Sequence, residues 1–448
     1  WQATGQTVCP MNVGVIGAGW AGLAAAISLH DAGHAVTIHE ASGTLGGRAR
    51  SVRRPEFAVP LDNGQHILLG AYSHTLSLMQ RLGLNTETAF VRQPLALKAA
   101  DHSFELRCID LPSPWHAAVG VFRARGWNLP EKLALTRAIL RLKNRRWTVV
   151  PDQSVSCWLE RHRQPARIIQ RFWEPLCLAA LNTPLHDASI DMLARVLGDS
   201  LDAGQHASDV LIPTTDLSDL WANHVPGDIT IHRRSTIRKI TREGSGYRLD
   251  GSCSYDALVV ATAPASAHRL LAGLPQIPHA TPLLESLSAF APVPIATLIL
   301  ALERPWYDLP DNMLMLDDQA HPGALGQWLF NHAHIAATPQ RKHLLCVVIS
   351  DCRALMTLER GEAIEQLLRQ IRTQTAHGSV MPRLAAHTLI IEKRATFAAT
   401  PGLTRPDNAS PWNNLMVAGD WTDTGYPAVL EGAVRSGQRA AALLCQGY

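Results

Sequence analysis

A glycine-rich unit over residues 13–50 constrains the fold of this chain more than any other stretch. A short β-branched run, residues 13–16, leads through Gly17 and the sequence GAGWAG into an alanine-rich segment. A second apolar run, residues 36–39, ends at Glu40. This order predicts a strand, a tight turn, a helix and a second strand with an acid at its end.

The glycines and the acid of this unit have separate physical roles. Gly17 allows the tight turn, Gly19 lets the backbone approach a pyrophosphate, and Gly22 lets the helix pack closely against the strand. The helix N-terminus offers N–H groups to phosphates, and Glu40 can accept hydrogen bonds from a ribose. A glycine turn alone can also serve packing, but the complete unit predicts a dinucleotide site. Further predicted contacts are Trp20, Ala21 and Ala41.

Composition argues for a globular protein without a nucleic-acid partner. The 448 residues suffice for two or three domains, and the net charge of +3 is too small to indicate nucleic-acid binding. The eight cysteines show no C-x-x-C pair or zinc spacing, so we expect reduced thiols in a cytoplasmic protein and assign no metal. Without a signal sequence or an apolar run of ~18 residues, we expect neither secretion nor a membrane span.

Two internal stretches contain candidate catalytic residues. The sequence LDNGQHILLG, residues 61–70, is either a ligand contact through Gly64, Gln65 and His66 or a turn that needs glycine for a positive φ. The sequence RFWEPLCLAALN, residues 171–182, has Glu174 as its only acid. That carboxylate is either paired with Arg171 or held with a raised pKa for chemistry.

The stretch over residues 130–147 predicts a basic amphipathic helix that begins near a proline. One interpretation is an interfacial helix on anionic lipid, and the other is a solvated helix face. Both stay open from the sequence.

The C-terminal part predicts a second cofactor contact. An apolar strand, residues 415–418, ends in Gly419 and Asp420, and a helix begins near Ala428, with Val429 and Leu430 as further predicted contacts. Asp420 can accept hydrogen bonds from hydroxyl groups of a ligand, and the helix N-terminus can face a ligand that carries negative charge.

The turn Gly46-Gly47-Arg48 resembles the second phosphate-binding turn of the flavin amine oxidase and phytoene desaturase superfamily, and the chain is similar to that superfamily over nearly its whole length. The resemblance implies an α/β fold with a discontinuous, Rossmann-like FAD-binding domain, an α+β substrate domain built on a mixed sheet, and a helical subdomain. It implies non-covalent FAD, with further contacts at Ile237 and Ala261, and a three-stranded insertion over residues 229–249.

The implied boundaries divide the chain into five segments. The FAD-binding domain takes residues 11–84, 205–266 and 395–448. The mostly helical, membrane-facing part takes residues 85–204, and the substrate-domain sheet takes residues 267–394.

Five stretches resemble a narrower group, the bacterial squalene-associated FAD-dependent desaturases, which are hydroxysqualene dehydroxylases. They are GWAGLAAA, LGGRARS, LDNGQHILLG, RFWEPLCLAALNT and AGDWTDTGYPAVLEGAVRSG. The resemblance implies reduction of hydroxysqualene to squalene in the bacterial route to hopanoids. Val429 stands where amine-oxidising relatives usually place an aromatic residue, which argues against an amine substrate. The alternatives are a carotenoid-type desaturase, a non-catalytic FAD-binding or lipid-carrier protein, and an amine oxidase.

The implied reaction needs an acid for the leaving hydroxyl, and His66 and Glu174 are the candidates. For His66 a structural hydrogen bond near the cofactor is the alternative. The chain has no second GxGxxG unit, so we expect an external electron donor. A hydrophobic isoprenoid substrate gives the basic helix a purpose, and we therefore expect peripheral contact with the anionic inner membrane.

Overall fold

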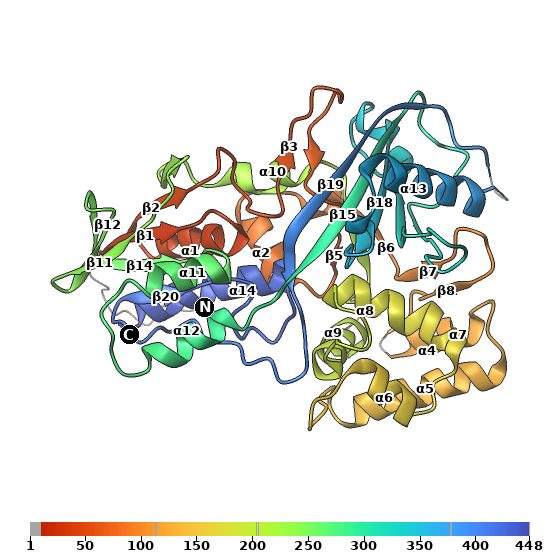
Figure 1. Cartoon of the computed structure of the whole chain (residues 1–448), viewed down its shortest axis with the longest axis horizontal. Coiled ribbons are helices and arrows are strands. Elements are labelled where there is room, and N and C mark those ends of the chain that lie inside the picture. Colours follow the sequence, from red (N-terminus) through yellow and green to blue (C-terminus); the bar gives the residue numbers. More distant parts are fainter. Residues whose placement is uncertain (1–9, 113, 203, 205, 377–378, 448) are drawn as a thin grey trace.

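The computed structural model describes residues 10–447 except 113, 203, 205, 377 and 378, so residues 1–9 lie outside it. Two five-stranded sheets and a layer of helices form the main body of the described residues, beside four smaller sheets (Figure 1). The first sheet has the strand order β10-β2-β1-β14-β20, and all its pairings are parallel. Its strands are β1 (Asn12–Ile16), β2 (Ala35–Glu40), β10 (Thr230–Arg233), β14 (Ala257–Val260) and β20 (Leu415–Val417).

The strand β10 corrects the prediction for residues 229–249. It pairs with β2 at the edge of the parallel sheet instead of joining the three-stranded insertion. That insertion is antiparallel and contains β11 (Ile240–Glu243), β12 (Gly246–Leu249) and β13 (Cys253–Tyr255). The apolar pattern located strands here, but tertiary pairing decided which sheet each one joined.

Helices from the two ends of the described chain pack together on the parallel sheet (Figure 1). They are α1 (Trp20–Asp31) and α14 (Leu430–Cys445). A Cβ atom at Gly437 of α14 would lie 2.1 Å from the carbonyl oxygen of Ala21 in α1, so this contact requires glycine. The helix α2 (Ser73–Arg81) also packs against α14.

The second sheet is antiparallel, with the order β16-β17-β18-β15-β19. Its strands are β15 (Pro292–Leu302), β16 (Met313–Met315), β17 (Trp328–Asn331), β18 (Leu344–Ser350) and β19 (Leu384–Phe397). The register between β15 and β19 shifts between Val293 and Ile295, which accommodates Pro294, a residue without an N–H donor. The helix α13 (Arg360–Gln374) buries Ile364, Leu367 and Ile371 against this sheet's own hydrophobic cluster.

Residues 85–204 begin with short strands and continue as helices. The strands are β6 (Phe90–Gln93), β7 (Ala96–Lys98) and β8 (Glu105–Arg107), and β6 pairs with β9 (Val210–Pro213), which also pairs with β5 (Leu68–Leu69). The helices are α4 (Trp115–Arg123), α5 (Leu129–Asn144), α6 (Val155–Arg161), α7 (Ala166–Ile168), α8 (Glu174–Leu181) and α9 (Ile190–Asp202). A π-helical turn, Ile169–Trp173, joins α7 to α8. Remaining elements are β3 (Ser51–Val52), β4 (Leu61–Asp62), α3 (Thr86–Ala89), α10 (Leu217–Leu220), α11 (Pro264–Leu271) and α12 (Ala280–Ser288).

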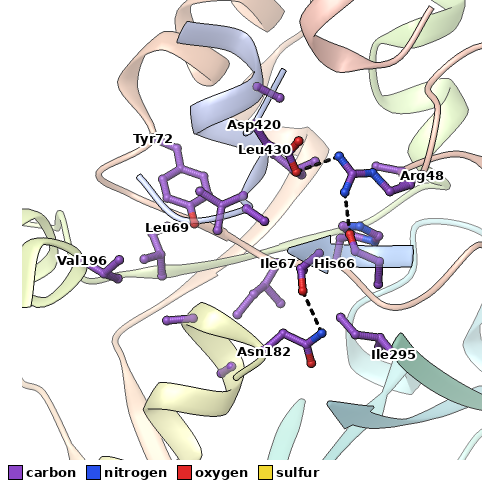
Figure 2. Close-up of a pocket in the computed structure, with 18 of the residues that line it drawn as sticks. Arg48, His66, Ile67, Leu69, Tyr72, Asn182, Val196, Ile295, Asp420 and Leu430 are labelled. Atoms are coloured by element: carbon purple, nitrogen blue, oxygen red, sulfur yellow. Dashed lines mark hydrogen bonds and ion pairs between the residues drawn. The ribbon is translucent and has the colours of Figure 1, made fainter. Parts of the chain in front are cut away.

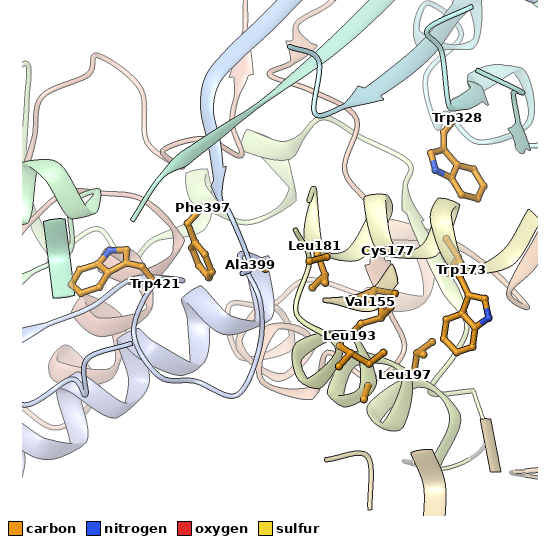
Figure 3. Close-up of a cluster of buried hydrophobic side chains, with 14 of the residues drawn as sticks. Val155, Trp173, Cys177, Leu181, Leu193, Leu197, Trp328, Phe397, Ala399 and Trp421 are labelled. Atoms are coloured by element: carbon orange, nitrogen blue, oxygen red, sulfur yellow. The ribbon is translucent and has the colours of Figure 1, made fainter. Parts of the chain in front are cut away.

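The helical layer and the antiparallel sheet share one hydrophobic cluster (Figure 3). Trp173, Leu193 and Trp328 belong to it, and each is less than one tenth exposed. The same cluster reaches Phe397 and Trp421, near the parallel sheet. No helix among the described residues is long and apolar enough to cross a bilayer.

Candidate active site

A cavity of about 1030 Å³ extends from the carboxyl ends of the parallel strands into the helical layer. Ile16, Glu40 and Ala261, at the ends of β1, β2 and β14, line one part of it. In open sheets of this kind, ligands bind at the carboxyl ends of the strands. The cavity therefore begins where the sequence predicts a dinucleotide.

The two glycine turns form the floor of this part. Gly17 has a φ of 102° and donates its N–H to the carbonyl of His39 over 2.8 Å. A Cβ at Gly47 would lie 2.9 Å from the Cα of Gly19, and a Cβ at Gly17 would lie 2.7 Å from the carbonyl oxygen of Ala261, so neither Gly17 nor Gly47 has room for a side chain. Bare backbone on both sides leaves N–H groups accessible to phosphate oxygens.

Gly22 and Glu40 have roles in the fold itself. A Cβ at Gly22 would lie 1.9 Å from the carbonyl oxygen of Gly17, so this glycine allows α1 to follow the turn closely. The two oxygens of Glu40 accept hydrogen bonds from the N–H groups of Ala18 and Ser42, both over 2.7 Å. Glu40 thus fixes the glycine turn while it lines the cavity.

Arg48 and Asp420 join the two ends of the chain (Figure 2). Arg48 Nη2 lies 2.7 Å from Asp420 Oδ2, and Nη1 donates to the carbonyl of Ala395 over 2.7 Å. Asp420 raises the pKa of the Arg48 guanidinium, so the cation is permanent. Because both residues line the cavity, the pair presents a charged wall beside the glycine turns.

Several groups around the first part of the cavity fit a bound dinucleotide. The N-cap residues of α1 and α14 are Gly19 and Val429, and no side-chain hydrogen bond caps either helix. Arg50 Nε and Thr262 Oγ1 are buried, belong to cavity-lining residues, and have no partner among the described residues. Buried donors without partners are costly, and a ligand with phosphate and hydroxyl oxygens would satisfy them.

The loop after β4 brings His66 to the cavity (Figure 2). Gly64 has a φ of 103°, and His66 Nδ1 donates to the Gly64 carbonyl over 2.9 Å. Burial lowers the pKa of His66, so the neutral ring carries its proton on Nδ1. A hydrogen bond fixes the side chain of Gln65, because its Oε1 lies 2.9 Å from Nε2 of the buried His332.

Glu174 does not line this cavity. It lies in the first turn of α8, where its Oε2 accepts a hydrogen bond from Gln319 Nε2 over 3.2 Å. Burial and the neighbouring carboxylate of Asp318 raise its pKa. The pairing with Arg171 considered from the sequence is absent, since Arg171 lies 3.3 Å from Asp317 instead.

The structure places most of the predicted cofactor contacts on the wall of one cavity, and Gly22 lies behind it. The cavity-lining members are Gly17, Gly19, Trp20, Ala21, Glu40, Ala41, Gly46, Gly47, Arg48, Gly64, Gln65, His66, Ile237, Ala261, Gly419, Asp420, Val429 and Leu430.

The polar residues of the cavity wall that were missed from the sequence include Tyr72 and Asn182 (Figure 2). Tyr72 is 8% exposed, and burial raises its pKa, so its phenol keeps the proton. Asn182, with a φ of 49°, ends α8 and donates to Thr396 Oγ1 over 2.9 Å. Tyr72 lies in no quoted motif, whereas Asn182 is the last residue of the stretch 171–182 that holds Glu174.

The other part of the cavity is apolar. Its lining comes from β7, β8, α4, α5, α8, α9 and the antiparallel sheet. It includes Leu97, Leu106, Val121, Leu135, Ile139, Phe172, Leu176, Leu193, Val196, Leu197, Met313, Trp328 and Phe330. A binding space of this composition suits a large apolar molecule.

The part of the cavity at the glycine turns, which fits a dinucleotide, continues into the apolar part, and this arrangement suits an oxidoreductase with a redox cofactor. The sequence profile described as flavin containing amine oxidoreductase matches residues 20–445. The chain therefore belongs to the flavin containing amine oxidoreductase family, whose members are FAD-dependent oxidoreductases.

Two named relatives are similar to the chain in sequence, and one solved structure is similar to it in fold. The chain is 27% identical to a hydroxysqualene dehydroxylase of Zymomonas mobilis, over 96% of this chain and 98% of that protein. It is 30% identical to a hydroxysqualene dehydroxylase of Rhodopseudomonas palustris, over 97% and 98%. Cyclohexylamine oxidase from Brevibacterium oxydans has the same fold, with a TM-score of 0.69, 19% identity, and coverage of 98% of this chain and 99% of that one.

Proposed function

We propose that this chain reduces hydroxysqualene to squalene with FAD that is bound non-covalently. The observation that carries the proposal is that the part of the cavity at the glycine turns continues into its large apolar part. The similarity to two proteins named hydroxysqualene dehydroxylase supports the choice of substrate.

The residues that would hold FAD are those of the first part of the cavity. The glycine turns and the N-terminus of α1 would bind the diphosphate, and Glu40 would face the adenosine ribose. Asp420 would accept from the ribityl chain, and the N-terminus of α14 would face the flavin ring. The stretch between Cys352 and Cys445 contains no cysteine, which supports non-covalent binding.

The substrate would occupy the apolar part of the cavity. Its walls are apolar, which would keep water from adding back to the delocalised cation that forms when the allylic hydroxyl leaves. When bound and reduced, the flavin supplies the hydride that replaces the hydroxyl group. Val429 leaves the wall near α14 without the aromatic ring expected for an amine substrate.

His66 is the better placed of the two candidate acids. It lines the cavity, whereas Glu174 does not. Its Nδ1 is committed to the Gly64 carbonyl, and its Nε2 has no hydrogen-bond partner among the described residues. A proton added at Nε2 would be available to the leaving hydroxyl, which would depart as water and return His66 to its neutral form.

Electrons would come from outside this chain, because the sequence offers no second dinucleotide fingerprint for a nicotinamide cofactor. The substrate would come from a membrane, since a C30 isoprenoid dissolves in bilayers. We therefore place the enzyme at the cytoplasmic face of the inner membrane as a peripheral protein.

The function is tested by product analysis of purified enzyme supplied with FAD and hydroxysqualene in detergent. Anaerobic incubation with dithionite should yield squalene, and omission of the reductant should stop the reaction. Release of peroxide with amines would instead favour an amine oxidase. Conversion of phytoene by the oxidised enzyme, with hydroxysqualene unchanged, would favour a desaturase.

A further inference from the structure

Large apolar side chains are exposed on two neighbouring helices, α4 and α5. Trp115 and Phe122 of α4 are 64% and 52% exposed, and Leu129 and Leu140 of α5 are 59% and 50% exposed. Trp115 and Phe122 are about two helical turns apart and Leu129 and Leu140 about three, so each pair lies along one side of its helix. We call these four residues the α4–α5 apolar patch. Of the nine large apolar side chains exposed among the described residues, six lie in residues 111–150, so the exposure is concentrated here.

The same two helices also line the active-site cavity. Ala118 and Val121 of α4, and Leu135 and Ile139 of α5, face inward and are part of its wall. Trp115 and Leu140 belong to both surfaces, because they line the cavity and are at least half exposed. At Trp115 and Leu140, within the patch, the wall of the cavity therefore reaches the surface of the molecule.

The charge around the patch is almost entirely positive. Residues 114–147 contain eight basic residues and one acid, Glu131. Glu131 is only 7% exposed and accepts the N–H of Asn128 in a capping box, so its charge does not face the surface. Lys143 pairs with Asp202 at 2.6 Å beside the cavity, whereas Arg123, Arg137, Arg141, Arg145 and Arg146 are exposed.

We propose that the α4–α5 apolar patch inserts into the surface of an anionic lipid bilayer, so that the cavity opens directly into the lipid. The identity of the molecule that enters the cavity rests on the proposed function. The docking itself rests on the α4–α5 apolar patch alone. The two helices would lie in the plane of the interface, because apolar side chains bordered by exposed cations match a headgroup layer above acyl chains. At 16 residues, α5 is too short to span a bilayer.

This geometry gives the substrate a route without water. An isoprenoid in the bilayer would pass between Trp115 and Leu140 and meet the apolar wall of the cavity. A docked protein would close the same opening, since Trp115 and Leu140 are part of the surface it would cover. The opening thus favours lipid over a protein partner as the occupant.

The test compares two pairs of substitutions of equal chemistry. F122E/L129E places two carboxylates on the patch without touching the cavity lining. M356E/V380E places them on two exposed residues elsewhere, which are 42% and 85% exposed. Each full-length protein is floated with phosphatidylcholine vesicles that contain about 30% phosphatidylglycerol, an anionic lipid. Turnover of hydroxysqualene is then measured in the same vesicles and in detergent micelles.

Wild type and M356E/V380E should float, and F122E/L129E should lose at least ~tenfold in vesicle binding. Turnover by F122E/L129E should fall ~tenfold in vesicles and stay within ~twofold in micelles, which also shows that the variant is folded. Flotation of F122E/L129E like wild type, no flotation of wild type, or a patch-dependent dimer that does not float would overturn the proposal. Absence of turnover in micelles would overturn the proposed function, while flotation would still decide the docking.

Discussion

At the scale of single residues, the cavity wall combines two glycine turns with His66, whose Nε2 has no hydrogen-bond partner among the described residues. The glycine turns, Glu40 and Asp420 were predicted because each belongs to a motif whose spacing reflects its chemistry. Tyr72 and Asn182 were missed because each reaches the cavity only through the packing of α2 and α8. The second role of Glu40, as an acceptor for the N–H groups of Ala18 and Ser42, also depends on the folded turn.

Replacement of His66 tests the proton donor. Burial lowers the pKa of His66, so the protonated form accumulates only as the pH falls through that lowered value. If Nε2–H donates the proton, the rate of squalene formation should rise toward acid pH in the wild type. H66Q should lower the rate by about 10² to 10⁴ and remove this rise.

The matched control for H66Q is H102Q, at an exposed histidine outside the cavity lining. Its pH profile should match that of the wild type. An acid-side rise that persists in H66Q would show that His66 is not the donor.

Replacement of Gly47 tests whether the second glycine turn binds the cofactor. Gly47 has a φ of 62°, and a Cβ there would meet Gly19 at 2.9 Å, so G47A should weaken FAD binding at least ~tenfold. G33A is the control, because Gly33 has a φ of 86° but open space around it. Both variants carry backbone strain, and only G47A should change the FAD dissociation constant measured by flavin fluorescence. Equal affinities in the two variants would remove the turn from the site.

At the scale of elements, strand and helix positions followed from apolar periodicity, but their partners did not. Residues 229–233 form a strand as predicted, yet it joins the parallel sheet through β2, which lies almost 200 positions earlier. A local pattern carries no information about such a pairing. The same holds for α2 and α14, which meet through the carboxylate of Glu431, a contact between segments far apart in the sequence.

Glu431 connects these two helices and is 0% exposed. Its oxygens accept from Thr75 N, Thr75 Oγ1 and His74 N over 2.7 to 3.1 Å, and Arg435 Nε lies 2.9 Å away. E431A would leave these buried donors without an acceptor, so we expect the free energy of unfolding to fall by about 3 to 5 kcal/mol. E365A, at an exposed glutamate of α13, should change it by less than ~0.5 kcal/mol in the same urea titration. Similar stabilities of E431A and E365A would contradict this role.

At the scale of the whole molecule, a buried ion pair joins β4 to the segment just before β18 of the antiparallel sheet. Arg341, next to β18, donates to the Pro60 carbonyl and to Asp62 Oδ2 over 2.8 and 2.9 Å. Asp62 directly precedes the segment that carries Gly64 and His66. The sequence predicted both sheets, but this cross-connection depends on how they pack and was not predictable.

R341M tests this connection. Burial already raises the pKa of Asp62, and loss of the cation would raise it further. A carboxyl whose pKa is higher in the folded than in the unfolded state is stabilising only below its unfolded pKa. The stability of R341M should therefore fall as the pH rises through the raised pKa of Asp62, and D62N/R341M should lose this dependence. Equal pH dependence of the melting temperature in R341M and wild type would contradict the prediction.

The central claim, that one cavity holds both the flavin and the alcohol that it reduces, is tested most directly by an anaerobic single turnover. The bound flavin is reduced photochemically, hydroxysqualene is added, the absorbance of oxidised flavin is followed, and the lipid is extracted. The claim predicts return of the oxidised spectrum with one squalene formed for each flavin. Flavin that stays reduced beside unchanged alcohol, in protein that has bound FAD, would contradict it.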